Sequence, residues 1–143
     1  MSDKVSKTAA SAVRARNRIG DHIYQTPLIP ARQVGSDNGS TVLFKAENFQ
    51  HTGSFKFRGA MSKLSAQSDD TRLITASSGN HGIAAARAAK TLSKKVTVVL
   101  PETVVQAKLQ KIQAYGVDVI LHGAETGLAE QHAQHLAASQ GYT

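Results

Sequence analysis

The sequence contains no cysteine, so disulfide bonds and thiolate metal sites are excluded and the redox compartment stays open. No apolar run approaches the ~20 residues of a membrane-spanning helix. The N-terminus, MSDKVSKTAASAVRARNR, also lacks the apolar core of a signal peptide. These absences predict a cytoplasmic protein without a membrane partner.

Aromatic residues are scarce, at 5% of the chain, whereas the net charge is +7. Residues 1–63 carry ten Lys/Arg against four Asp/Glu, and residues 64–143 carry seven against six. A basic first half raises nucleic-acid binding as a hypothesis. The charges are dispersed and few rings are available to stack on bases, which favours a solvated surface with a pocket for anions. No nucleic-acid partner is expected.

Three common cofactor and nucleophile patterns are also missing. The sequence has no GxGxxG after a strand, no GxxxxGK[ST] phosphate loop and no GxSxG elbow. His132 and His135 are spaced i, i+3 with Glu125 nearby, which raises a metal site as an alternative. No third ligand follows at a sensible spacing, so a solvated helix face is favoured and no metal is expected.

From residue 72 onward, short apolar strands alternate with amphipathic helices. Before that point we expect a helix over 5–23, an extended segment over 25–30, a turn over 35–40, one strand over 41–47 and a helix over 55–64. After it the expected strands are 73–76, 96–100 and 117–121, with helices near 82–92, 105–112 and 125–139. This alternation predicts an α/β fold with an open parallel sheet and flanking helices in three layers. The next strand of the pattern is expected at Gly141–Thr143, where the sequence stops.

The stretch TGSFKFRGA, Thr52–Ala60, places Lys56 between a glycine-serine turn and a helix start. A lysine that forms a Schiff base needs its pKa lowered and its nitrogen held in place. Phe55 and Phe57 could cover it, Phe55 could stack on a flat ring, and Ser54 could cap the helix. An ordinary exposed lysine is the alternative, and the nonapeptide as a whole argues against it.

A second turn, SSGNHG at Ser77–Gly82, joins an expected buried strand to an expected helix. Free N–H groups at such a helix start bind carboxylates and phosphates. The turn also falls at the carboxyl end of a parallel strand, where ligands bind in such sheets. Two serines, two glycines and an asparagine are more than a simple helix cap requires. The role of His81 stays open between a ligand donor and a packing residue.

At these residues the chain resembles the fold-type II pyridoxal-phosphate enzymes, in the branch of threonine/serine dehydratases and serine racemases. The matching pieces are TPL at 26–28, KAENFQHTGSFKFRGA at 45–60, ASSGNHG at 76–82 and, less closely, VLPETVVQAKLQKIQAYG at 99–116. The resemblance implies that residues 1–49 begin the large domain with one helix and one strand, and that residues 50–143 form the small α/β domain. Members of the family run to about twice this length, with the phosphate-binding loop beyond residue 143, so a fragment is expected.

The resemblance also implies roles for individual residues. Lys56 would form the Schiff base with pyridoxal 5'-phosphate and move the substrate Cα proton, with Phe55 against the cofactor ring. Asn80 would bond the phenolic oxygen of the cofactor, and the turn residues Ser77, Ser78, Gly79, Asn80 and His81 would hold the substrate carboxylate. Ser78 would be the second catalytic residue, in the place of the racemase proton donor.

The expected reaction is elimination of water and ammonia from threonine or serine to give a 2-oxo acid, in a full-length enzyme that is a homo-oligomer. Serine racemase and a non-catalytic carboxylate-binding module are the alternatives. Threonine, serine and hydroxyaspartate are not distinguished by these motifs.

Overall fold

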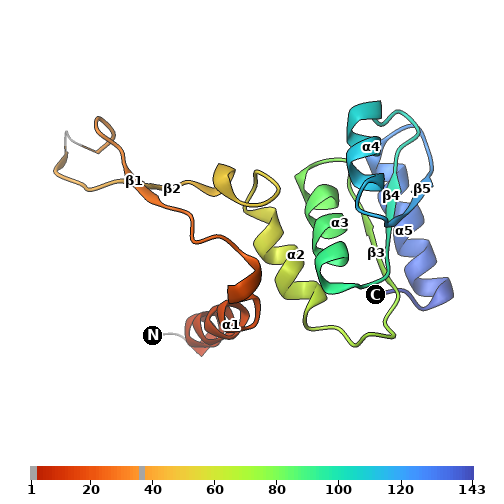
Figure 1. Ribbon diagram of the computed structural model, residues 1–143, viewed down its shortest axis with the longest axis horizontal. Coiled ribbons are helices and arrows are strands. Elements are labelled where there is room, and N and C mark those ends of the chain that lie inside the picture. Colours follow the sequence, from red (N-terminus) through yellow and green to blue (C-terminus); the bar gives the residue numbers. More distant parts are fainter. Residues whose placement is uncertain (1–2, 36–37) are drawn as a thin grey trace.

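A three-stranded parallel sheet forms the centre of the larger part of the molecule in the computed structural model, which describes residues 3–35 and 38–143 (Figure 1). Its strands are β3 (Leu73–Ala76), β4 (Val96–Leu100) and β5 (Asp118–Leu121), in that spatial order. Leu73 pairs with Val96, and Thr97 pairs with Asp118. The central strand, VTVVL, is buried at every position, as a β-branched run covered on both faces should be.

Helices cover both faces of this sheet, with α3 and α5 on opposite sides (Figure 1). One face packs against α2 (Lys56–Leu64), α3 (Asn80–Leu92) and α4 (Gln106–Gln113). The other packs against α5 (Thr126–Gln140), through Ala129 and Ala133. The expected three-layer α/β architecture with a parallel sheet is therefore confirmed.

The edge of β3 carries the last residue of the chain. The Thr143 N–H donates to the carbonyl of Arg72, and the Ile74 N–H donates to the carbonyl of Thr143, both at 3.0 Å. This is the hydrogen-bond pattern of a parallel strand beside β3. The expected strand start at Gly141–Thr143 thus has its first pairing residue.

The first 49 residues form a different kind of structure. Helix α1 (Asp3–Ile19) leads through a 3₁₀ turn, η1 (Gly20–His22), into β1 (Leu28–Pro30), and β2 (Leu43–Lys45) is followed by η3 (Glu47–Phe49). Strands β1 and β2 pair antiparallel and extend away from the parallel sheet (Figure 1), and we call the first 49 residues, which include them and α1, the arm.

Two sequence expectations for this region are corrected. The segment contains two strands rather than one, because the extended stretch over 25–30 finds a partner far along the chain. The helix ends at Ile19 rather than at residue 23, where Gly20 opens the 3₁₀ turn. In the turn expected over 35–40, Gly35 has φ +86° and accepts from the Ser40 N–H, whereas Ser36 and Asp37 lie outside the described residues.

The arm carries its apolar side chains on the surface, with Leu28, Ile29, Leu43 and Phe44 between 44% and 58% exposed. Its helix α1 is joined to α2 by the buried Ile19 and by Arg18, which donates to Ser62 and Ser65. None of the helices among the described residues is long and apolar enough to cross a bilayer.

Candidate active site

Lys56 is the first residue of α2, and the chain before it is built to start that helix. Gly53 has φ +72°, a conformation that favours glycine. The hydroxyl of the buried Ser54 accepts from the Lys56 N–H at 3.3 Å, which satisfies one of the free donors of the first turn, as expected from the sequence. Phe57 is 1% exposed and fixes the same turn in the core.

The side chain of Lys56 is exposed, and its amine lies 5.3 Å from the centroid of the Phe55 ring. Phe55 is 61% exposed, so its ring is available beside the amine. Phe57, the other expected cover, instead packs edge-on against the His51 ring, with centroids 5.3 Å apart. Only one of the two flanking rings is therefore placed to contact a ligand at Lys56.

The Ser77–Gly82 turn connects the carboxyl end of β3 to α3. The helix begins at Asn80, two residues earlier than expected, so Asn80 and His81 occupy its first turn. A Cβ atom on Gly82 would lie 1.8 Å from the Ser77 carbonyl oxygen, so only glycine allows the helix to approach the strand this closely. The Ser77 hydroxyl accepts from the Gly79 N–H at 3.2 Å, whereas Ser78 is partly exposed.

His81 lies in the first turn of α3, and its titration is influenced by the charge of Lys56. Its Nε2 is hydrogen-bonded to the Thr75 hydroxyl at 3.0 Å. Partial burial of the ring, and secondly the positive charge of Lys56, hold the pKa of His81 below its ordinary value. Both effects favour the neutral form of the imidazole.

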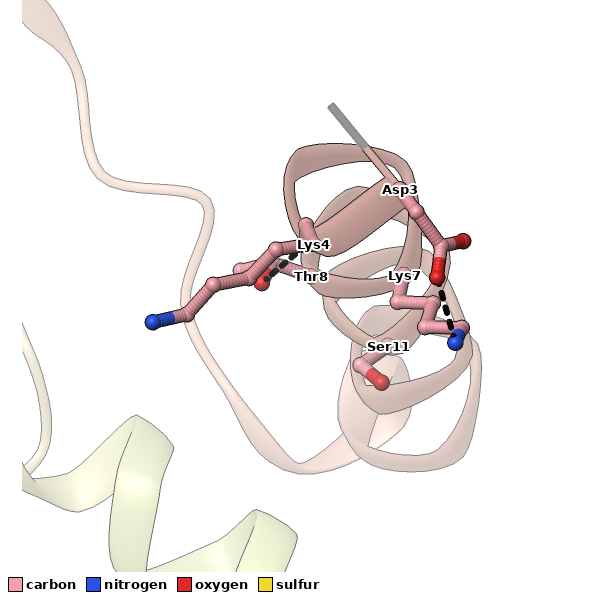
Figure 2. Close-up of a pocket in the computed structure, with 5 residues that line it drawn as sticks. All are labelled: Asp3, Lys4, Lys7, Thr8 and Ser11. Atoms are coloured by element: carbon pink, nitrogen blue, oxygen red, sulfur yellow. Dashed lines mark hydrogen bonds and ion pairs between the residues drawn. The ribbon is translucent and has the colours of Figure 1, made fainter. Parts of the chain in front are cut away.

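Two hollows lie beside His81, with volumes of about 220 and 300 Å³. Both are lined by Ile74, Thr75, His81 and Thr143, at the outer edge of β3. Another hollow, of about 440 Å³, lies on α1 and is lined by Asp3, Lys4, Lys7, Thr8 and Ser11 (Figure 2). All of its lining residues come from one helix, so it has no second wall to enclose a ligand.

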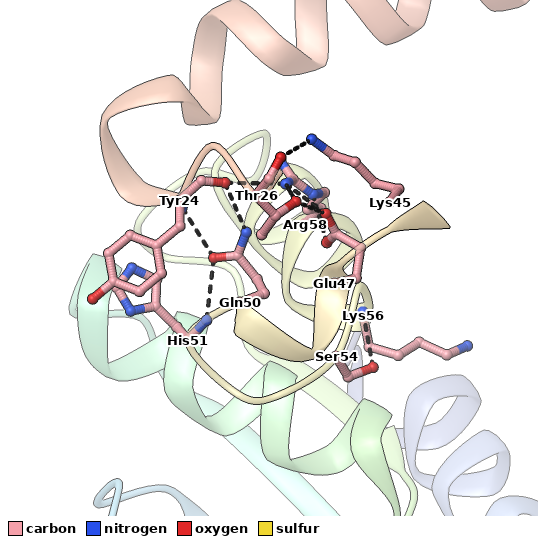
Figure 3. Close-up of polar contacts among 9 residues, drawn as sticks. All are labelled: Tyr24, Thr26, Lys45, Glu47, Gln50, His51, Ser54, Lys56 and Arg58. Atoms are coloured by element: carbon pink, nitrogen blue, oxygen red, sulfur yellow. Dashed lines mark hydrogen bonds and ion pairs between the residues drawn. The ribbon is translucent and has the colours of Figure 1, made fainter. Parts of the chain in front are cut away.

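A polar cluster behind Lys56 was not found from the sequence. Arg58 forms a two-pronged ion pair with Glu47, and Thr26 and the Tyr24 carbonyl complete it (Figure 3). The partners are 11 to 34 positions apart, so no local pattern predicts them. The one signal was that Glu47 and Arg58 both fall inside the long KAENFQHTGSFKFRGA stretch.

The histidines of the last helix do not assemble a metal site. His132 stacks on His122, with ring centroids 3.9 Å apart and an angle of 13° between the planes. Burial, and then the neighbouring His122 and His135, lower the pKa of His132. Across residues 3–35 and 38–143, no group of three or more His, Asp or Glu side chains is arranged to hold a metal ion.

An exposed lysine at the start of α2, and a glycine- and serine-rich turn between β3 and the packed helix α3, are features that one class of enzyme combines. In this class a lysine holds a carbonyl cofactor and a nearby turn receives the anionic end of a substrate. The family described as pyridoxal-phosphate dependent enzyme matches residues 19–143, and the chain belongs to that family. The expected cofactor dependence is thereby confirmed at the level of the family.

Individual relatives agree with this assignment. The chain is 38% identical over 138 residues to the L-threo-3-hydroxyaspartate ammonia-lyase of Saccharomyces cerevisiae, covering 94% of this chain and 42% of that enzyme. It superposes with a TM-score of 0.87 on threonine deaminase isoform 2 from Solanum lycopersicum, at 31% identity, covering 100% of this chain and 40% of that one. A pyridoxal 5'-phosphate-dependent aspartate racemase gives a TM-score of 0.79 at 38% identity, covering 94% of this chain and 44% of that one. The chain spans about two fifths of the length of the curated relatives it matches.

Proposed function

We propose that this chain supplies the lysine and the substrate-carboxylate side of a pyridoxal-phosphate-dependent ammonia-lyase acting on a small hydroxy amino acid. The observation that carries the proposal is that the exposed Lys56 amine, beside the Phe55 ring, and the Ser77–Gly82 turn stand at the starts of α2 and α3, two helices that pack against each other. Under this proposal residues 50–143 are the small domain, and residues 1–49 begin the large one. A cytoplasmic homo-oligomer without a nucleic-acid partner remains part of the proposal.

The residues present fit one side of the cofactor. Lys56 offers an exposed amine, and the exposed Phe55 ring beside it offers a flat apolar surface. Asn80, exposed in the first turn of α3, offers an amide for the phenolic oxygen. When bound, the cofactor supplies an electron sink for the charge left on the substrate Cα.

The protein residues would then act in a definite order. The Lys56 amine, when free, would take the proton from the substrate Cα, acting as a general base. The N–H groups at the start of α3, with the Ser78 hydroxyl and the His81 ring, would hold the substrate carboxylate. Loss of the Cα proton and of the β-hydroxyl, followed by hydrolysis, gives a 2-oxo acid and ammonia.

A direct test measures capture of the cofactor by Lys56. Pyridoxal phosphate added to the chain should give a visible-range absorbance band that is lost in Lys56→Ala. Borohydride reduction followed by mass spectrometry should find the label on Lys56. Lys63→Ala is the matched control, because Lys63 is an exposed lysine of the same helix. Equal labelling at Lys56 and Lys63 would count against the proposal.

Racemisation is a second candidate, favoured by the 38% identity to an aspartate racemase. Ser78 would then return a proton to the opposite face of Cα. Chiral chromatography after incubation with L-serine separates the two candidates. Ser78→Ala should abolish D-serine formation while leaving elimination measurable, and an absence of D-serine with the unmodified chain would exclude the racemase.

A carboxylate-binding module without catalysis is the third reading. It predicts that calorimetry detects amino acids binding to the chain in the absence of cofactor, with no visible band on adding pyridoxal phosphate. Binding should then be lost when Ser78 is replaced and be indifferent to Lys56→Ala.

A further inference from the structure

The ion pair behind Lys56 joins three segments that are far apart in sequence. Arg58 Nε donates to Glu47 Oε2 at 2.8 Å, and Arg58 Nη2 donates to Glu47 Oε1 at 2.7 Å. The same Nη2 donates to the Tyr24 carbonyl at 3.0 Å. The Thr26 hydroxyl donates to Glu47 Oε1 at 2.5 Å (Figure 3). Helix α2 is therefore tied to η3 and to the segment that enters β1.

This cluster is shielded from water, unlike an ordinary surface ion pair. The side chains of Arg58 and Glu47 are 28% and 15% exposed, and Thr26 is 6% exposed. Gln50, at 3% exposed, donates to the Tyr24 carbonyl and accepts from the Tyr24 N–H, both at 3.0 Å. A planar, two-pronged guanidinium–carboxylate pair fixes orientation as well as distance.

Helical geometry relates this anchor to the lysine. Lys56 and Arg58 are two residues apart in α2, and at about 100° per residue their side chains leave the helix on nearly opposite sides. In Figure 3 the Lys56 amine extends away from the Arg58–Glu47 pair. Fixing Arg58 therefore fixes the direction in which Lys56 leaves the first turn.

We propose that Arg58 and Glu47, with Thr26, are positioning residues that hold the first turn of α2 so that Lys56 is presented to the Ser77–Gly82 turn. The proposal rests on the proposed role of Lys56 as the reactive amine. A lysine has a long and flexible side chain, so the placement of its Cα is what the fold can control. A misplacement of about 1 Å in a catalytic group can reduce the rate by roughly 100-fold.

The test reads the position of Lys56 through His81, without cofactor or substrate. The His81 pKa is measured by NMR of the imidazole protons, with the resonance assigned from His81→Gln. Lys56→Gln defines the shift that follows complete loss of the lysine charge, and that shift should be upward. Glu47→Gln and Arg58→Lys should each raise the His81 pKa by at least half of it.

The direction of the shift separates positioning from a direct charge effect. Removing the Glu47 carboxylate makes the surroundings more positive, which by itself would lower the His81 pKa. Arg58→Lys keeps the charge and removes only the two-pronged geometry. An upward shift in both variants is therefore the signature of a displaced Lys56.

Two controls match the chemistry and the loss of stability. Asp69→Asn breaks the other long-range ion pair, in which Lys94 donates to Asp69 at 2.6 Å, and should leave the His81 pKa unchanged. Val98→Ala destabilises the core of the sheet without touching the cluster, and should also leave it unchanged. A shift of equal size in Val98→Ala would assign the effect to general loosening and overturn the proposal.

The remaining outcomes are also decisive. If Lys56→Gln moves the His81 pKa while Glu47→Gln and Arg58→Lys do not, the ion pair does not position Lys56. If Lys56→Gln leaves it unmoved, the lysine does not face the turn and the proposal fails with it. If pyridoxal phosphate gives no band on the unmodified chain, the proposed function fails, but the titration still decides whether the pair positions Lys56.

Discussion

The molecule has two regions that keep their apolar side chains in opposite places. From residue 50 to 143, the central strand β4 is buried along its whole length and helices cover both faces of the sheet. In the first 49 residues, Ile19, Thr26 and Ala46 are buried, whereas Leu28, Ile29 and Phe44 lie on the surface. The sheet region is stabilised by apolar packing on both faces of the sheet, whereas the arm is attached through a few buried residues.

Because the arm is held at only a few points, its position depends on the contacts that attach it to α2. Arg18 and Ile19 join α1 to α2. The Glu47–Arg58 pair joins η3, which follows β2, to the same helix. Both attachments meet on α2, the helix that begins with Lys56, so the arm and the reactive lysine share one support.

The largest effect should come from closing the space at Gly82 in the sheet region. Gly82→Ala forces a Cβ against the Ser77 carbonyl, 1.8 Å away, and should lower the free energy of unfolding by at least about 3 kcal/mol. Gly59→Ala is the control, because its Cβ meets nothing within 4 Å. Because Gly59 lies inside a helix, its replacement by alanine should raise the free energy of unfolding by about 0.5–1 kcal/mol. Urea denaturation measures both, and equal effects would contradict the close approach at Gly82.

The next effect compares the same substitution in the two regions. Val98→Ala removes a side chain that is 0% exposed in β4, and should cost about 2–3 kcal/mol from lost burial and the cavity left behind. Val13→Ala removes a side chain that is 59% exposed on α1, and should change stability by less than about 0.5 kcal/mol. A large loss at Val13 would show that α1 is packed in solution against a surface the structure leaves open.

The two regions also differ in how far sequence alone predicts them. The strands over 73–76 and 96–100 were predicted to the residue from their short apolar runs, although β4 is buried at every position and β3 only at Leu73. The pairing of β1 with β2 was missed, since it joins residues across an irregular connection and its strands are exposed on both sides. Pairing over a distance leaves no periodic trace in a single sequence.

The candidate site divides in the same way. Lys56 and the Ser77–Gly82 turn were proposed from local residue types, and they stand at the starts of α2 and α3, which pack against each other. The Glu47–Arg58 pair was not predicted, because in the sequence each partner is indistinguishable from an ordinary surface charge. The helix Asn80–Leu92 begins two residues before the predicted start at Gly82, since Gly79 occupies its N-cap position.

Acid should weaken the link between the two regions before it affects the sheet core. The hydrogen bonds from Arg58 hold the pKa of Glu47 below its ordinary value of 4.5, so the pair stabilises the fold above that pH. The stabilisation is lost as the pH falls through the lowered pKa of the folded state. At pH 6 the free energy of unfolding of the unmodified chain, measured by urea denaturation, should exceed that of Glu47→Gln by about 1–2 kcal/mol, and this difference should shrink as the pH falls below 4.5. A difference that stays constant with pH would contradict this linkage.

The smallest effect is expected at the exposed start of α1. Lys7 Nζ and Asp3 Oδ2 lie 2.6 Å apart on α1, but both side chains are more than three quarters exposed (Figure 2). Water and salt screen such a pair, so Asp3→Asn should change the free energy of unfolding by less than about 0.5 kcal/mol. Comparison with Glu47→Gln under the same conditions makes the contrast quantitative, because each variant replaces one paired carboxylate by an amide. Equal losses would mean that shielding from water does not distinguish the two pairs. The Glu47–Arg58 pair would then stabilise the position of α2 no more than an exposed ion pair does.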